Sequence, residues 1–202
     1  MTLSKGTLLS TATPSVLVRV LAYSGFLAAA VLVVNTLKRA GVLPLTPATQ
    51  LLAPFGQLFS IALILALFAA VVALRGRLGS IGVVIYVGAL ASLVGVEYVI
   101  NLVLPYLDRS TIDELLAGPL GIALAVASIS FLVGTIVFYA ALWRVPGSPK
   151  AAIVLIVLGT IPIALRMSFP EVVLQLGLAL VSAGVVLVTV WLVRRNRAVQ
   201  RG

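Results

Sequence analysis

Long apolar runs constrain this chain more than any other feature of its sequence. A helix needs roughly 20 apolar residues to cross a hydrocarbon core of about 30 Å. The chain has 62% hydrophobic and 9% charged residues, more apolar surface than a water-soluble domain of 202 residues buries around one core. Six apolar runs cover residues 16–37, 55–74, 80–104, 120–143, 149–166 and 171–193. The bilayer is therefore expected to be the solvent of this protein.

Each run is continuously apolar, whereas a β-barrel would show alternation in segments of about ten residues. We therefore predict an all-α polytopic membrane protein, with residues 1–202 forming one six-transmembrane-helix bundle. Thr13-Pro14 before the first run and Ser148-Pro149 before the fifth are typical of helix starts. Ser168 and Glu171 have the spacing of a capping box, so Glu171 is expected to cap the last helix.

The basic residues predict the orientation of the bundle. With both termini in the cytoplasm, ten lysines and arginines lie on the inner side and four on the outer side, as the positive-inside rule requires. We therefore expect a multi-pass protein of the plasma membrane. Residues 194–202 form a basic cytoplasmic tail, in which Arg194, Arg195 and Arg197 contact anionic lipid head groups. Because the basic residues sit at the ends of apolar runs, nucleic acid is not an expected partner.

Two outer connections, 38–54 and 105–119, are longer than a turn and contain helix-start residues. Thr46-Pro47 predicts a short helix over 48–52. Thr111 and Glu114 have capping-box spacing, and Gly118-Pro119 closes that segment. We expect short interfacial helices on the outer side, which either cover the outer mouth of the bundle or anchor the loops among the head groups.

Two polar residues inside the third run are the main clue to function. Glu97 and Asn101 are one helical turn apart on the same face, and Glu97 lies roughly 10 Å from the outer end of the helix. An unpaired carboxylate at that depth would cost about 2.5 to 3.5 kcal/mol, so it is expected to face the bundle interior. The pair either belongs to a ligand or ion site or joins helices by hydrogen bonds.

Because helix direction alternates, further polar residues fall at a similar depth. They are Asn35, Gln57, Arg166 and Gln175, with Ser128 or Ser130 as additions from the fourth helix. Together with Glu97 and Asn101 they predict a polar outer half of the bundle and a candidate ligand-binding site. The alternatives are that Arg166 extends to the outer head groups and that Asn35 and the two glutamines are solvated at the interface.

Small residues four apart allow helix backbones to approach closely. The pairs are Ser24/Ala28, Gly25/Ala29, Gly88/Ser92, Ala91/Gly95 and Gly121/Ala125. We expect most of them to pack inside the bundle, and any face left over to dock a partner subunit.

Composition excludes several kinds of chemistry. The chain has no cysteine and no histidine, so disulfides, thiolate catalysis and the usual metal, haem and pigment ligands are absent. No nucleotide-binding loop, zinc signature or nucleophile elbow is present. We therefore predict that the protein is not an enzyme and holds neither a metal nor a cofactor.

Part of the sequence resembles a known group of proteins. The segments "ALRGRLGSIGVVIYVGAL", "GVEYVINLVLP", "AGPLGIAL" and "ALWRVPGSPKAAIVLIVLGTIP" resemble uncharacterised six-helix membrane proteins of bacteria. The resemblance covers about residues 74–162. It implies the six-helix topology, and it implies no activity because that group has none assigned.

Two functions remain open from the sequence. The one favoured is a non-enzymatic accessory or structural component that packs against lipid and partner subunits. The alternative is a small transport or solute-binding protein with an outward-facing polar pocket around Glu97 and Asn101. In general layout this alternative is similar to the substrate-binding components of vitamin uptake systems.

Overall fold

The computed structural model describes residues 15–199, and these residues are helical with no strand. Five helices are long and apolar enough to cross a membrane, namely α1 (Ser15–Arg39), α2 (Pro47–Ala70), α3 (Arg77–Leu102), α5 (Pro119–Trp143) and α7 (Glu171–Val199). Between the last two lies α6 (Lys150–Ala164), which is apolar but has only 15 residues. The all-α prediction is confirmed, and five of the six predicted spans have the required length.

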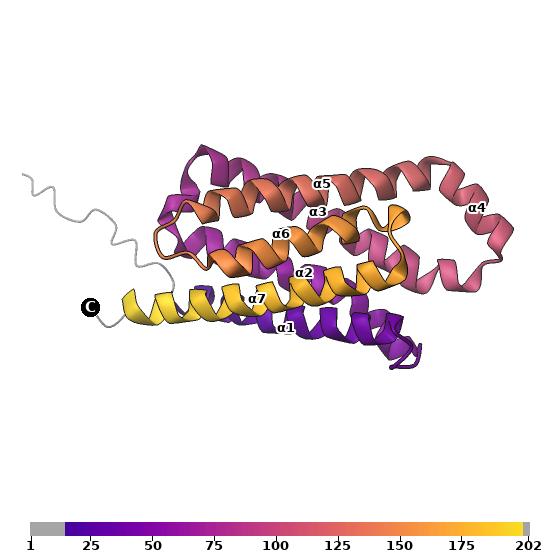
Figure 1. The fold of residues 1–202 in the computed structure, drawn as a ribbon, viewed down its shortest axis with the longest axis horizontal. Coiled ribbons are helices and arrows are strands. Elements are labelled where there is room, and N and C mark those ends of the chain that lie inside the picture. The colour runs from indigo at the N-terminus through magenta and orange to yellow at the C-terminus, as the bar shows by residue number, and fades with distance from the viewer. Residues whose placement is uncertain (1–14, 200–202) are drawn as a thin grey trace, which may run out of the picture.

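These six helices form a closed ring, which we call the ring throughout. Each helix packs against its neighbour in the order α1, α2, α3, α5, α6, α7, and α7 packs back against α1 (Figure 1). Chain direction alternates around the ring, so every second connection returns to the same end. The short helix α4 (Arg109–Ala117) projects from one end, which we call the α4 end (Figure 1).

Close backbone contacts at glycine hold neighbouring helices together. A Cβ placed on Gly134 of α5 would lie 2.7 Å from the Tyr86 backbone of α3, and one on Gly82 would lie 2.8 Å from the Phe138 backbone. A Cβ added to Gly159 of α6 would similarly lie 2.5 Å from the Gly177 carbonyl oxygen of α7. Only glycine fits at these crossings.

The small-residue pairs predicted from the sequence divide into two groups. On α1, Ser24, Ala28 and Ala29 are buried, and the Ser24 hydroxyl donates a hydrogen bond to the Phe59 carbonyl of α2 at 2.9 Å. On α3, a Cβ added to Gly88 or Gly95 would have no other atom within 4 Å. The small residues of α1 thus pack inside the ring, whereas the two α3 glycines border an open surface groove.

The loop between α1 and α2 differs from the prediction. Residues 48–52 do not form a separate short helix, because α2 begins at Pro47 and continues through them, rather than beginning at Phe55. Thr46 is its N-cap and forms a reciprocal capping box with Thr49. Pro54 lies within the helix, and α2 ends at Ala70, before the 3₁₀ turn Val72–Arg75.

The predicted second short helix is present as α4, but a different residue caps it. Asp108, rather than Thr111, is the N-cap, and its carboxylate accepts a hydrogen bond from the Thr111 N–H at 2.9 Å. Hydrogen bonds lower the pKa of the Asp108 carboxyl. The bond from the Ser110 hydroxyl has the largest effect, followed by those from the Thr111 N–H and hydroxyl. Gly118 ends α4 and Pro119 opens α5, as expected.

The last two helices also differ at their ends. α6 ends at Ala164 rather than Arg166, with Pro162 inside it, and the 3₁₀ turns Leu104–Tyr106 and Arg166–Ser168 follow α3 and α6. α7 continues to Val199, so residues 194–199 of the predicted basic tail are helical. The predicted start at Thr13-Pro14 and the end of the tail, residues 200–202, lie outside the described residues.

The outside of the ring is apolar along most of its length. Large hydrophobic side chains are exposed on every ring helix, for example Val84 at 72%, Ile122 at 68% and Leu176 at 59%. A soluble protein rarely exposes so large a continuous apolar surface. This surface suits contact with acyl chains, consistent with the composition of the five long helices.

Candidate functional site

A cavity of about 250 Å³ runs along the axis of the ring. All six ring helices contribute to its wall. In the half nearer the α4 end the wall carries polar and charged side chains, which are Asn35, Lys38, Arg39, Gln57, Glu97, Asn101 and Arg166. Ser60 lies deeper on α2. Further in, the wall is made by apolar and aromatic residues such as Leu90, Phe131 and Val185. The predicted polar half over an apolar half therefore describes the wall of this cavity.

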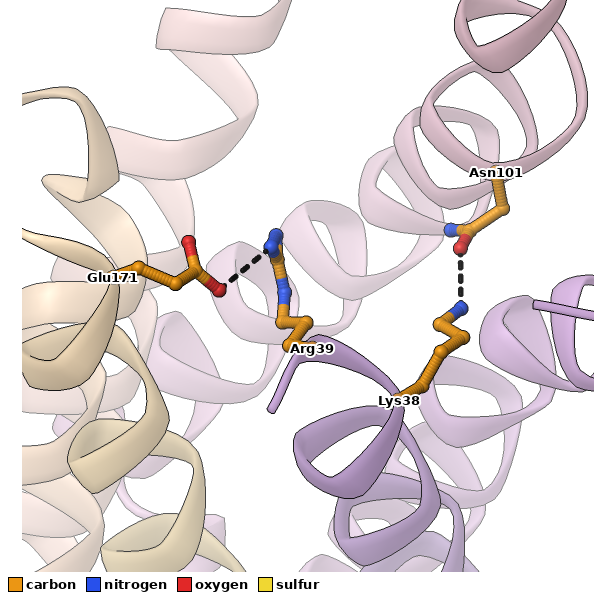
Figure 2. A network of polar contacts seen from close by, with 4 residues as sticks. All are labelled: Lys38, Arg39, Asn101 and Glu171. Carbon is orange, nitrogen blue, oxygen red and sulfur yellow. Dashed lines mark hydrogen bonds and ion pairs between the residues drawn. The ribbon is translucent and has the colours of Figure 1, made fainter. Parts of the chain in front are cut away.

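Asn101 is the centre of the hydrogen-bond network at the α4 end. Its side-chain oxygen accepts a hydrogen bond from Lys38 Nζ at 2.7 Å, which joins α1 to α3 (Figure 2). Its side-chain nitrogen donates to Glu97 Oε2 at 2.8 Å and to the Glu97 carbonyl at 2.9 Å. One amide group thus bridges a cation and an anion that make no direct ion pair within 4 Å.

Gln50 fixes the backbone of the same turn. Its Nε2 donates to the Asn101 carbonyl at 2.9 Å, and its Oε1 accepts from the Tyr106 hydroxyl at 3.3 Å. Gln50 is buried at 4% exposure and Asn101 at 9%. Because a buried polar group left unpaired costs about 1 to 3 kcal/mol, this set of bonds holds α1, α2 and α3 in one arrangement.

A second pair closes the ring at the same end. Arg39, at the end of α1, forms an ion pair with Glu171, at the start of α7, at 3.1 Å (Figure 2). Their side chains are 30% and 51% exposed, so the pair lies at the rim rather than in the interior. The carboxylate predicted to cap α7 therefore also links the first and last ring helices.

Four described polar residues of the cavity wall have side chains that make no hydrogen bond or ion pair to another described residue. They are Asn35, Gln57, Ser128 and Arg166, although Arg166 is close enough to Arg39, Glu97 and Glu171 to interact electrostatically. No buried side-chain nitrogen or oxygen is left unsatisfied in the described part of the chain. The polar atoms of these side chains are therefore accessible to a small molecule, and the side chains line one and the same cavity.

The predicted site residues are mostly brought together. Asn35, Gln57, Glu97, Asn101 and Arg166 line one cavity, as does Ser128 of α5. Gln175 is half-buried on α7 and is not among the residues that line this cavity. Ser130 faces a groove on the outer surface between α3 and α5. Arg166 lines the cavity with Glu97, but the two make no ion pair in the described chain.

Sequence reasoning missed Lys38, Arg39 and Gln50. Lys38 and Arg39 follow an apolar run, a position typical of residues that set membrane topology. Gln50 falls within the short interfacial helix predicted over 48–52, whereas the structure places it one turn into the longer helix α2. Continuation of that helix through Pro54 is what brings Gln50 into the ring beside Asn101.

No group of three or more acidic residues that could hold a metal occurs among residues 15–199. No family model, curated protein or solved structure matches this chain. The interpretation of the site therefore rests on its own geometry.

Proposed function

We propose that this chain is an integral membrane protein that binds a small solute in the cavity along the ring axis. The observation that carries the proposal is the polar end of that cavity, where the side chains of Asn35, Gln57 and Arg166 have no protein partner among the described residues. A cavity with an apolar wall and a few convergent polar groups is typical of ligand sites. The alternative predicted from the sequence, a pocket around Glu97 and Asn101, agrees with this geometry.

The proposed membrane setting has six crossings, with α6 as the sixth. At about 1.5 Å per residue α6 covers roughly 22 Å, so the turn Arg166–Ser168 and the preceding loop would complete its crossing. All five acidic residues of the chain lie at the α4 end, whereas the opposite end carries Arg75, Arg144 and Arg194 among its basic residues. This asymmetry supports a plasma-membrane protein with cytoplasmic termini and an outward-facing cavity.

The proposal is for binding or transport rather than catalysis. The cavity presents one carboxylate, Glu97, whose Oε2 accepts a hydrogen bond from Asn101, and the hydroxyl of Ser60 donates to the Gly56 carbonyl at 2.8 Å. Neither hydrogen bond activates a nucleophile, because no base among residues 15–199 contacts the Ser60 hydroxyl. Amide, carboxylate and guanidinium groups around an enclosed space are suited to recognising a polar group.

A second candidate function, an accessory subunit, is favoured by a different observation. A groove between α3 and α5 is lined by small residues that include Gly88, Ser92, Gly95 and Ala123. No side chain of the described residues fills the space beside Gly88 and Gly95. Such a surface would accept a helix of a partner subunit or an acyl chain.

Native mass spectrometry of the protein extracted from its own membrane in mild detergent tests both candidates. We expect the wild-type ion to carry a small added mass, which Ser128→Leu removes by filling the cavity. Ser130→Leu is the matched control, since Ser130 faces the outer groove, and it should keep the added mass. A wild-type ion without added mass, or one unchanged by Ser128→Leu, would contradict solute binding. A bound polypeptide would support the accessory function.

A further inference from the structure

We infer that the solute is an amphipathic monoanion, whose anionic group binds Arg166 and whose apolar part lies against the aromatic wall of the cavity. This inference rests on the proposed function and adds the class of the ligand. It follows from the charges on the cavity wall and their direct partners, the chemistry of the inner wall and the size of the cavity.

One cation of the cavity wall makes no hydrogen bond and no ion pair within 4 Å to a described residue. Lys38 and Glu97 are joined through the Asn101 amide, and Arg39 is paired with Glu171. Arg166 is the remaining charge on the wall, and it makes no hydrogen bond or ion pair to any described residue. Three cations therefore face two carboxylates, and the excess is one positive charge.

The surroundings of Arg166 make that excess charge significant. Arg166 is half-buried and closely follows α6, whose last residues Ile163 and Ala164 also line the cavity. A charge in such low-dielectric surroundings is stabilised by an opposite charge with good geometry. A planar guanidinium binds a carboxylate or a phosphate through two parallel hydrogen bonds, which gives both affinity and orientation.

Two neutral amides on the wall of the same cavity suit the same ligand. Asn35 and Gln57 line the wall at the polar end and have side-chain N–H groups without a protein acceptor among residues 15–199. Amide N–H groups donate hydrogen bonds to the oxygens of a carboxylate. A cationic ligand would instead have to approach Arg166 and Lys38 against electrostatic repulsion.

The inner wall is suited to an apolar group. Tyr86 and Phe131 line it with ring centroids 5.8 Å apart, and Tyr139 lies 6.0 Å from Tyr86. An apolar cavity of about 150 Å³ accommodates benzene, so about 250 Å³ suits a molecule of roughly ten non-hydrogen atoms. The ligand class is thus a short acid with an aromatic or branched apolar part.

The probe for the test is phenylacetate, which has this size, charge and apolar part. Its neutral isostere phenylacetamide is the matched ligand. Titration calorimetry would use the full chain in nanodiscs of phosphatidylcholine at pH 7. We expect phenylacetate to bind at least about tenfold more tightly than phenylacetamide, because a charge-assisted hydrogen bond contributes more than a neutral one.

Substitution of Arg166 tests the assignment of the cation. Arg166→Gln should remove most of the preference for phenylacetate over phenylacetamide. Arg109→Gln removes the same charge from the α4 end, but that side chain is 88% exposed on α4, so the preference should stay unchanged. Equal binding of the two probes by the wild type, or a preference that survives Arg166→Gln, would overturn the inference. So would the failure of both probes to bind.

These outcomes are separable from failure of the proposed function. Equal binding of both probes that Ser128→Leu abolishes would reject the anion but support solute binding in the cavity. A monoanion could come from water or from the bilayer as a fatty acid. Displacement of phenylacetate by octanoate, a fatty acid of about the same size, would identify an acid with an acyl chain, and failure of octanoate to compete would identify a water-soluble aromatic or branched acid; both results retain the monoanion.

Discussion

At the scale of single residues, the sequence revealed the site through residues that contrast with their neighbours. Glu97 and Asn101 were found because each is a polar residue inside an apolar run. Lys38 could not be found in this way, because a lysine at the end of a run has the same appearance whether it contacts a lipid or Asn101. Which of the two contacts forms depends on how α1 and α3 pack against each other, and a local sequence pattern does not determine that packing.

The bridging role of Asn101 leads to a prediction about stability. Asn101→Leu should lower the free energy of unfolding by about 1 to 3 kcal/mol, because Lys38 loses an acceptor and Glu97 loses a donor. Detergent titration from mild detergent into dodecyl sulfate, followed by circular dichroism, measures the change.

A double-mutant cycle separates this bridge from the loss of amide packing. Lys38→Met in the Asn101→Leu background should cost less than Lys38→Met in the wild type, by about 0.5 kcal/mol or more. Additive effects of the two substitutions would show that the Lys38–Asn101 hydrogen bond does not stabilise the ring.

At the scale of elements, the sequence predicted helix identity well and helix ends less well. Length and continuous hydropathy locate α1, α3, α5 and α7, because the thickness of the bilayer sets a minimum that each run satisfies. The start of α2 was wrong because Pro54 was interpreted as the end of a loop, whereas the helix continues through it. The cap of α4 was wrong because two residues with capping side chains, Asp108 and Thr111, lie three apart.

Close helix crossings give a prediction at this scale. Gly134→Ala should lower the free energy of unfolding by about 1 to 3 kcal/mol, since the added methyl group would lie 2.7 Å from the Tyr86 backbone and force α3 and α5 apart. Gly88→Ala is the matched control, because nothing lies within 4 Å of a Cβ there. It should leave stability unchanged or raise it. Equal losses for both variants would show that the close approach of α3 and α5 at Gly134 is not the source of the cost.

At the scale of the whole molecule, closure of the ring is what creates the site. Contact between α1 and α7, supported by the Ser182 hydroxyl donating to the Ala29 carbonyl at 3.2 Å, joins residues far apart in the chain. The axial cavity exists only because the first and last helices meet. The alternating direction of successive helices predicts that these polar residues lie at a similar depth in the membrane. It does not predict that five of them line the same cavity. Closure is a property of packing rather than of any single run.

The number of crossings is the whole-molecule property that the proposed function most depends on. The chain has no native cysteine, so single cysteines can report on which side of the membrane each connection lies. Pro146→Cys lies before α6 and Ser168→Cys lies after it, and both native residues are exposed. With six crossings, a membrane-impermeant maleimide should label Ser168→Cys in intact cells, and should label Pro146→Cys only after permeabilisation.

Single cysteines at two further positions serve as references for the outer and the inner side of the membrane. Ser110→Cys on α4 should be labelled from outside and Ala198→Cys near the end of α7 only from inside, as cytoplasmic termini require. Labelling of Pro146→Cys and Ser168→Cys from the same side would mean that α6 enters the bilayer without crossing it. Arg166 lies on the cavity wall at the α4 end, so that result would place it on the opposite side of the membrane from Ser110 and would contradict the outward-facing cavity. The accessibility of the solute site and the path of α6 are therefore decided by one experiment.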